Sequence, residues 1–544
     1  AIQRLFVTMR HLFNRGFYKP MGVSGETLRE ALLTLSPEIY GSIAQEKVEL
    51  DGLLYVIDRL PQGIEECRYI NLTSDEGYSD THFTPIIPPK RRRNCYRIDA
   101  EQMNIEITRG RSEIYDILTH ITFLFIESHK IMKQVLINEK GDVNRDWQKL
   151  EVAVLQTENL TKDEREIALS HTANILGRTF KEVSGVYAKF SSAAKPERFL
   201  DIIYWLGKLA LDEILLENKR TVTFSSVLRE TLGQHIHGEQ WADSIKAVLH
   251  TQGLLKRPIH IISANMHSVQ NSLYAPETLK TKLKGQNKLQ IFEELSASSK
   301  HRDTVAKVAT KEGMTFIKDK SGTNIDVQIF DTAKYSSGDY ATKIKNLDDA
   351  DKPVIVVMDY AFGEQAYETM DELLKPYKSN DDTAIYLNVS SISIMGKAGI
   401  LTGGKGDIMI PSSHIFEGTA DNYPFENGLK IADLKGHDIG VYDGAMISVL
   451  GTSLQNKDLL RYFNRSTWGV VGLEMEGAHY QKAIQAHSKV RKSIRTDVCV
   501  NYAYYASDNP LETGSTLASG GLGTTGVKPT YLITEIILKQ IFGS

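Results

Sequence analysis

The sequence has few cysteines, no long uninterrupted apolar run and almost no net charge. Its three cysteines, Cys67, Cys95 and Cys499, are too few and too widely spaced for a disulfide scaffold or a structural zinc cluster. We therefore expect a reducing compartment, the cytoplasm. The most apolar stretch, 199–216, contains four charged residues, too many for a membrane span. The formal net charge of −4 does not favour nucleic acid or an anionic membrane as a partner.

The composition is that of a globular protein. The 544 residues are 41% hydrophobic and 24% charged, enough to bury a substantial core. Segments 112–136 and 199–218 have apolar residues at three- and four-residue spacing, which predicts helices. From 71 to 97, prolines and a basic run indicate an exposed loop. We predict a mostly α-helical N-terminal domain, residues 1–255, with a role in regulation or oligomerisation left open.

Residues 256–544 alternate short β-rich runs with amphipathic helical stretches. The expected strands are 259–263, 326–330, 354–358, 384–394, 407–410, 446–450, 469–475 and 498–505. This alternation is typical of an α/β fold in which helices cover both faces of a sheet. Ligands of such folds bind beyond the carboxyl ends of the strands, so the polar residues that follow each strand are candidates for a site.

Glycine and acidic residues follow four of these strands. Residues 359–364 read DYAFGE, 395–407 read MGKAGILTGGKGD, 474–478 read EMEGA and 506–510 read ASDNP. In this order the motifs resemble the superfamily of nucleoside phosphorylases and nucleosidases, which includes purine and uridine phosphorylases, methylthioadenosine nucleosidase and AMP nucleosidase. The resemblance covers residues 257–544 and implies a nucleoside-phosphorylase-like mixed sheet flanked by helices. AMP nucleosidase, which also has an additional N-terminal domain, is nearest in architecture.

The resemblance implies residue roles in cleaving a purine N-glycosidic bond, a reaction that passes through an oxocarbenium-like ribosyl cation. Asp508, beside Ser507, would act as general acid at the leaving base. Glu476 would hold the ribose hydroxyls near the developing positive charge, with Met475 against the sugar. Period-two alternation puts Glu474 on the same strand face as Glu476, where it assists directly or supports its neighbour.

Other residues of the motifs are candidates for contact with substrate, water or phosphate. Gly396 and Lys397 lie in a segment that we interpret as a glycine turn, where backbone and cation can approach an anion. Gly363 belongs to a similar turn. Glu364 after it is either a water-positioning carboxylate or a helix N-terminal acid. His267, which follows the first strand of this half, is either a site residue or a structural one.

Two departures from the superfamily bear on the reaction. Its phosphorylases use arginines around the phosphate, including one on the strand before the glycine turn, and segment 385–395 has none. Its methylthioadenosine nucleosidases have an arginine shortly before the Ser-Asp pair, where this sequence has Tyr504 and Tyr505. We therefore favour hydrolysis of a purine nucleotide or nucleoside, AMP first. The alternatives are a phosphorolytic purine nucleoside phosphorylase, a non-catalytic nucleotide sensor and a helical scaffold for protein contacts.

The resemblance implies no metal, no organic cofactor, and a homo-oligomer, either dimer or hexamer. His235 and His237 have no further ligand residue near them in sequence, so we predict a surface turn there. Residues 521–526 match G-x-G-x-x-G but do not directly follow a strand, so we interpret them as a loop before the last helix.

A basic run in the first half has two readings. It continues to Arg109 and Arg111, and it is either a solvated loop or a phosphate or nucleotide site. Such a site would be regulatory or would complete the catalytic pocket across a subunit contact, because guanidinium groups bind phosphate in a bidentate way. The candidate residues are Arg91, Arg92, Arg93 and Arg97.

Overall fold

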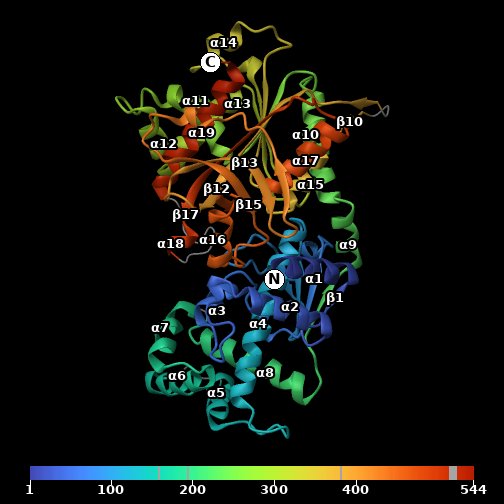
Figure 1. Ribbon diagram of the computed structural model, residues 1–544, viewed down its shortest axis with the longest axis vertical. Helices are drawn as coiled ribbons and strands as arrows, with labels where there is room; N and C mark the ends of the chain where they lie inside the picture. Colours follow the sequence, from blue (N-terminus) through green and yellow to red (C-terminus); the bar gives the residue numbers. More distant parts are fainter. Residues whose placement is uncertain (157–159, 193–194, 380–382, 514–522, 544) are drawn as a thin grey trace. The chain divides into compact units, whose positions relative to one another are not determined.

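The computed structural model describes residues 1–156, 160–192, 195–379, 383–513 and 523–543. The chain forms two compact units (Figure 1), one of residues 1–108 and 113–233 and the other of residues 109–112 and 234–544. This division precedes the predicted boundary at 255/256, because α10 (Ile236–Thr251) packs against α15 (Gln365–Leu373) of the second unit. No helix among the described residues is long and apolar enough to cross a membrane.

The first unit is largely helical, as its apolar periodicity predicts. The long helix α4 begins with Arg111 and Ser112, which belong to the second unit, and continues through the first with Ile114, Ile117 and Ile121 buried. The helices of this unit are α1 (Ile2–Arg15), α2 (Val23–Leu35), α3 (Leu50–Ile57), α4 (Arg111–Val135), α5 (Arg145–Leu155), α6 (Lys162–Leu176), α7 (Phe180–Phe190), α8 (Arg198–Leu215) and α9 (Ser226–Gly233).

A five-stranded sheet also belongs to the first unit, in the order β1-β5-β2-β4-β3. Sequence periodicity did not indicate it, because each strand has only two to five residues. The exposed loop predicted for 71–97 is wrong at both ends, where strands begin or finish, and Tyr96 is buried. The strands are β1 (Phe17–Tyr18), β2 (Tyr69–Thr73), β3 (Cys95–Arg97), β4 (Gln102–Glu106) and β5 (Thr221–Phe224).

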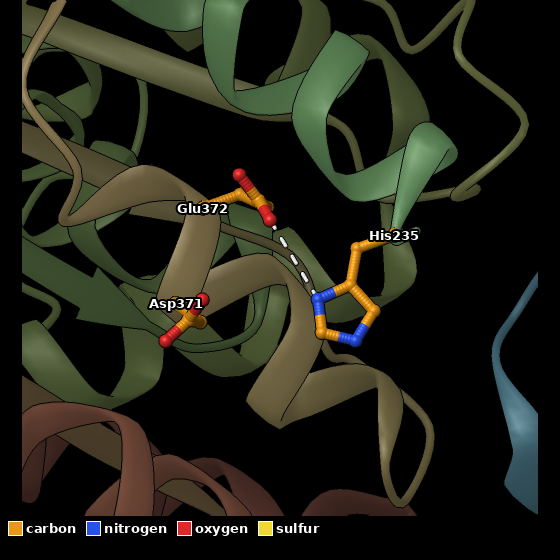
Figure 2. Close-up of side chains that lie close together, drawn as sticks. All are labelled: His235, Asp371 and Glu372. Atoms are coloured by element: carbon orange, nitrogen blue, oxygen red, sulfur yellow. Dashed lines mark ion pairs between the residues drawn. The ribbon is translucent and has the colours of Figure 1, made fainter. Parts of the chain in front are cut away.

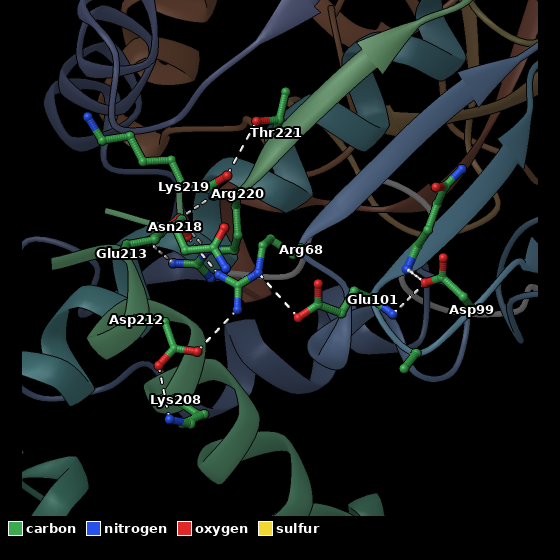
Figure 3. A network of polar contacts seen from close by, with 12 residues as sticks. Arg68, Asp99, Glu101, Lys208, Asp212, Glu213, Asn218, Lys219, Arg220 and Thr221 are labelled. Carbon is green, nitrogen blue, oxygen red and sulfur yellow. Dashed lines mark hydrogen bonds and ion pairs between the residues drawn. The ribbon is translucent and has the colours of Figure 1, made fainter. Parts of the chain in front are cut away.

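Buried ion pairs connect the residues just before β2 and β5 with helix α8 (Figure 3). Arg68, 3% exposed, donates to Asp212 of α8 at 3.1 Å and to the carbonyl oxygen of Asn218 at 2.7 Å. Arg220 binds Glu213 through two hydrogen bonds, of 2.8 and 2.7 Å. Each buried guanidinium therefore has a carboxylate partner, and removing one partner would leave an uncompensated charge.

The second unit is built on a mixed sheet in the order β14-β13-β15-β16-β12-β6-β9-β8-β7. Strand β17 pairs with both β12 and β13, so β12, β17, β13, β15 and β16 close into a ring. The strands are β6 (Ile259–Ser263), β7 (Met314–Ile317), β8 (Val327–Asp331), β9 (Val354–Met358), β12 (Val389–Ile400), β13 (Ile408–Phe416), β14 (Asp421–Pro424), β15 (Val441–Ser448), β16 (Val470–Glu474) and β17 (Cys499–Asp508); β10 (Tyr377–Lys378) and β11 (Ala384–Ile385) form a separate hairpin.

Helices lie on both faces of this sheet (Figure 1), which confirms the predicted α/β class. The core on one face contains residues of α10, α15 and α17, and the core on the other contains residues of α11, α12, α13 and α19. The helices not yet given are α11 (Met266–Leu279), α12 (Lys288–Ala297), α13 (Ser299–Lys311), α14 (Ala341–Lys345), α16 (Lys457–Arg465), α17 (Gly477–Gln485), α18 (Pro510–Thr513) and α19 (Val527–Phe542). Of the predicted loop 521–526, residues 521 and 522 lie outside the described residues, and a single 3-10 turn, 523–526, precedes α19.

Candidate functional site

The acidic motifs predicted from the sequence meet around Gly399 of β12. Leu473, the residue before Glu474, pairs with Gly399 from one side, and Asp508 pairs with it from the other. Adjacent strands are about 4.8 Å apart, so the backbones of Leu473 and Asp508 are separated by about 10 Å. The fold therefore brings the EMEGA and SD motifs to opposite sides of one strand, within reach of one small ligand.

Glu474 is a buried carboxyl group, 2% exposed, at the junction of β16 and α17. Its Oε2 accepts hydrogen bonds from the backbone N–H groups of Glu476 and Gly477, and its Oε1 accepts one from the Ser448 hydroxyl. Burial, followed by the charge of Glu476, raises the pKa of Glu474 to about 8, although these hydrogen bonds act in the opposite direction.

Glu476 is the second member of this pair. Its Oε1 accepts a hydrogen bond from the backbone N–H of Gly363 at 2.9 Å. Burial raises the pKa of Glu476 to about 7, while hydrogen bonds from backbone N–H groups and the positive charge of Arg109 lower it. We call Glu474 and Glu476 the glutamate pair. Because the two groups interact, their protons are lost in steps that belong to the pair, and the pair is poised to hold about one proton near neutral pH.

A short segment that follows the basic run, Arg109–Ser112, packs on the loop that contacts Glu476. Arg111 Nη1 lies 3.1 Å from Glu364 Oε1, and the Ser112 hydroxyl oxygen accepts the N–H of Glu364 at 2.8 Å. The guanidinium carbon of Arg109 lies 5.1 Å from the centre of the Phe362 ring. Glu364 is thus an ion-pair partner of Arg111.

The Ser112 hydroxyl can accept the N–H of Glu364 because the backbone of Gly363 passes close to the Ser112 side chain. Gly363 has φ +56°, and a Cβ there would collide with the Ser112 side chain. Glycine is therefore required at 363 both for its left-handed conformation and for space. The turn predicted around Gly363 is present, and its N–H is the group that contacts Glu476.

Asp508 ends β17 next to a buried serine. The Ser507 hydroxyl donates to Asp508 Oδ1 and also lies 3.1 Å from the carbonyl oxygen of Ala398 in β12. Asn509 Nδ2 donates to the carbonyl oxygen of Gly403 at 3.1 Å. These bonds fix the end of β17 against β12 and the turn that follows it.

The glycine turn predicted at 396–399 is wrong, because β12 continues to Ile400 and pairs with β17 through this segment. A Cβ at Gly396 would lie 3.5 Å from the Tyr360 ring, an ordinary contact distance, so the packing there does not require glycine. Lys397 is exposed on the strand. The turn itself comes later, where Gly403 and Gly406 have φ of +117° and +91°.

Met475 and the tyrosines of β17 are neighbours of the glutamate pair and Asp508 along the chain. Met475 contributes an apolar side chain, and the tyrosines contribute hydroxyl groups. Met475 is 7% exposed in an apolar cluster that includes Leu473. The hydroxyl groups of Tyr505 and Tyr360 lie 3.2 Å apart, and Tyr504 OH lies 3.2 Å from Nε2 of His414. Burial lowers the pKa of His414 to about 3, so this imidazole is neutral at pH 7.

His235 has acidic neighbours that sequence proximity did not indicate. Figure 2 shows it beside Asp371 and Glu372 of α15, with Nδ1 3.6 Å from Glu372 Oε1. Arg491 donates to Asp371 at 2.6 Å and Lys375 to Glu372 at 2.6 Å. These carboxylates already face cationic side chains, so the cluster is better described as an ion-pair network than as a metal centre.

The basic run of the first unit is also engaged internally. Arg91 binds Asp116 with two hydrogen bonds, of 2.8 and 2.6 Å, and Arg93, 5% exposed, binds the same carboxylate at 2.8 Å. Arg97 pairs with Glu66 at 3.1 Å, and Arg92 is exposed. Arg91, Arg93 and Arg97 therefore form ion pairs within the first unit, and their pairing does not favour a phosphate or effector site there.

Comparison with known proteins gives a family and a set of distant structural likenesses. The model of a family described as "Family of unknown function (DUF6909)" matches residues 26–282 and 288–543. No curated protein matches the chain.

The solved structures similar to this chain cover about half of it. One is a Campylobacter jejuni 5′-methylthioadenosine/S-adenosyl homocysteine nucleosidase, 12% identical, TM-score 0.32, covering 53% of this chain and 99% of its own. The native futalosine hydrolase of Helicobacter pylori is 12% identical, TM-score 0.30, with coverage of 53% and 99%. The Neisseria meningitidis 5′-methylthioadenosine/S-adenosylhomocysteine nucleosidase is 12% identical, TM-score 0.31, with coverage of 52% and 99%. Likeness at this level is no argument about activity.

Proposed function

The chain belongs to the DUF6909 family of unknown function, and we propose that its second unit hydrolyses the N-glycosidic bond of a purine nucleotide or nucleoside. The observation that carries the proposal is the glutamate pair, of a buried Glu474 and a half-buried Glu476, held across Gly399 from Asp508. A reaction with a departing base and a ribosyl cation needs a proton donor at one end and negative charge at the other.

In the proposed reaction a water molecule attacks C1′ while the C1′–N9 bond breaks and its electron pair passes to the base. Asp508 acts as the general acid that gives a proton to N7 of the base, with the Ser507 hydroxyl orienting its carboxyl group. Ionised Glu476 accepts hydrogen bonds from the ribose hydroxyls and stabilises the positive charge on the sugar. The attacking water releases one proton, and Asp508 recovers one from solvent, so the protein returns to its starting state.

The other motif residues have supporting roles in this proposal. Glu474 holds the backbone of Glu476 through its carboxyl group and, with the higher pKa of the two, carries the shared proton. Gly363 fixes the Glu476 carboxylate through its N–H. Glu364 is held by Arg111 and Ser112, so we assign it to positioning of this loop. Lys397 and Gly396 lie on β12 near the site, without the anion-binding turn first expected.

Incubation of the full chain with AMP and with adenosine, with and without phosphate, tests the proposal by chromatography of the products. We expect release of the base without phosphate, loss of activity in Asp508→Asn, and wild-type activity in Asp458→Asn, which alters an exposed aspartate of α16. Strict phosphate dependence with a ribose 1-phosphate product would identify a phosphorylase. No base release from any purine nucleotide, with equal nucleotide binding by wild type and Asp508→Asn, would identify a sensor.

A further inference from the structure

A pocket of about 450 Å³ lies in the second unit beside the end of β6. It is lined by Asn265, the N-cap of α11, and by Gly526, the N-cap of α19, and neither helix has an acidic residue in its first turn. The N-terminus of a helix carries partial positive charge from its backbone dipoles. In α11 the N–H of His267 already donates to the Asn265 side chain at 2.9 Å, and Pro529 of α19 has no N–H, so the two helices contribute mainly through their dipoles. Tyr505, whose hydroxyl group contacts that of Tyr360, also lines the pocket.

The charged lining of this pocket is basic. Arg302 and His267 line it, whereas none of its lining residues within the described part of the chain is Asp or Glu. Arg302 Nη1 donates to the carbonyl oxygens of Leu295 at 2.7 Å and Ser296 at 3.1 Å, which fixes the guanidinium group at the wall. Burial, and then the charge of Arg302, lowers the pKa of His267. The described residues that line the pocket thus offer positive charge and no carboxylate, although the negative charge of Asp359, which is not among them, acts on His267 in the opposite direction.

Asn271 gives a second, independent indication of a ligand. Its side chain is 2% exposed and lines the pocket, and its Nδ2 donates to the Tyr531 hydroxyl at 2.8 Å. Its Oδ1 is buried and has no hydrogen-bond partner among the described residues. A buried amide oxygen in this situation is satisfied by a ligand that donates an O–H.

We propose that this pocket binds a phosphate group, with Arg302 and the two helix N-termini facing its charged oxygens and Asn271 accepting a hydrogen bond from its hydroxyl. Fixed guanidinium groups and helix N-termini are the usual binding elements for phosphate. The group is either free orthophosphate, whose monohydrogen form keeps a hydroxyl at neutral pH, or the phosphate of a purine nucleotide bound in its singly protonated form. Only the second source rests on the proposed function.

Calorimetric titration of the full chain with orthophosphate, AMP and adenosine tests this site, with AMP measured in the Asp508→Asn background so that it is not consumed. Arg302→Gln removes the charge but keeps a donor for the carbonyl oxygens of Leu295 and Ser296. We expect it to weaken phosphate binding by at least about tenfold. The matched control is Lys307→Gln, which removes an exposed positive charge from the same helix and should leave binding unchanged.

The imidazole proton signals of His267 provide a local readout by NMR. Bound phosphate should raise the pKa of His267 in the wild-type protein and leave it unchanged in Arg302→Gln. Circular dichroism verifies that the variant folds. If Arg302→Gln does not fold, Asn271→Asp, which places a negative charge in the pocket with little change of shape, should cause the same loss of binding.

The source of the phosphate group follows from competition. If Arg302→Gln weakens AMP binding and not adenosine binding, the pocket takes the phosphate of a nucleotide. If orthophosphate binds together with adenosine, it takes the free anion. The pocket is overturned if neither orthophosphate nor AMP binds, or if both bind equally well with and without the Arg302→Gln or Asn271→Asp substitution in a folded protein. Base release that is absent while phosphate still binds through Arg302 would instead overturn the proposed function alone.

Discussion

Each unit has a cluster of carboxyl groups, and the pKa values of the two clusters are shifted in opposite directions. In the first unit, Asp116 lies between Arg91 and Arg93, a set we call the arginine cluster. Burial alone would raise the pKa of Asp116, but the charges and hydrogen bonds of Arg91 and His120 hold it well below its ordinary value. In the second unit, the glutamate pair has backbone N–H groups and a hydroxyl as its nearest partners, and both of its pKa values are raised.

The carboxylate of Asp116 is a permanent, structural charge, whereas the glutamate pair can gain or lose a proton near neutral pH. A carboxylate paired with arginine stays ionised at every physiological pH and contributes to the fold. Carboxyl groups buried beside each other exchange a proton near neutrality, a property that concentrates in functional sites. Asp371 shows that the second unit also contains the first kind, since Arg491 and His487 hold its pKa at about 2. The contrast therefore follows from the neighbours of each group, whichever unit holds it.

Among changes to the two carboxyl clusters and their neighbours, removing the ionisable group of Glu476 should have the largest effect on activity. Because Gln cannot carry the negative charge that stabilises the ribosyl cation, we expect Glu476→Gln to lower kcat/KM by about 10²- to 10⁴-fold. Folding should be unaffected, since the amide still accepts the N–H of Gly363. Base release and thermal unfolding, with Glu239→Gln as an exposed control, check this. Activity within twofold of wild type would remove the glutamate pair from the mechanism.

The corresponding experiment in the first unit removes the carboxylate of the arginine cluster. Asp116→Ala leaves Arg91 and Arg93 without their shared carboxylate. We expect the free energy of unfolding to fall by about 3–5 kcal/mol, because a buried charge loses its partner. Urea unfolding measures this, and kcat/KM of the remaining folded protein should not change. A stable but inactive variant would contradict the assignment of this cluster to structure.

Arg109 should set the pH at which Glu476 ionises. Its positive charge lowers the pKa of Glu476, so Arg109→Ala should raise that pKa. Activity that needs ionised Glu476 is lost as the pH falls through this pKa. The acidic limb of the kcat/KM profile, expected near pH 7, should therefore move to higher pH by up to about one unit, while Arg109→Lys retains the wild-type profile. A limb that does not move would show that Arg109 acts elsewhere.

The smallest effect is expected from Ser112→Ala. The variant removes the acceptor for the N–H of Glu364 and leaves the ion pair of Arg111 in place. One neutral hydrogen bond contributes about 0.5–1.5 kcal/mol, so we expect kcat/KM to fall by about two- to tenfold. The variant Ser112→Thr keeps the hydroxyl group and should retain wild-type activity. Steady-state kinetics with both variants distinguish loss of the hydroxyl from loss of packing.

The sequence predicts best where a signal is local. Strands β6 and β9 occupy the predicted residues because short, fully buried apolar runs leave little choice. The EMEGA and SD motifs were found because each directly follows such a strand. By contrast, the contact of Arg111 with Glu364 joins residues 253 positions apart. The counter-charge of Arg91 lies on α4, so its pairing had no local signal either.

Of the signals in the sequence, glycine residues predict turns least reliably. Gly396 occurs in a run typical of a turn, yet it lies inside β12, where a Cβ would make only an ordinary contact with Tyr360. Gly363 was read from the same kind of signal and does have the left-handed conformation of a turn. A glycine therefore predicts a turn only where the fold requires its conformation or its small size.

One measurement tests the central claim most directly, that the glutamate pair and Asp508 cleave a base from ribose with water. The full chain is incubated with AMP and with adenosine in water enriched in ¹⁸O, and the base and sugar products are analysed by mass spectrometry. The account predicts free base together with a sugar that carries ¹⁸O at C1′, and neither product from Asp508→Asn. Absence of base release by the wild-type chain, or a sugar product without the label, would contradict it.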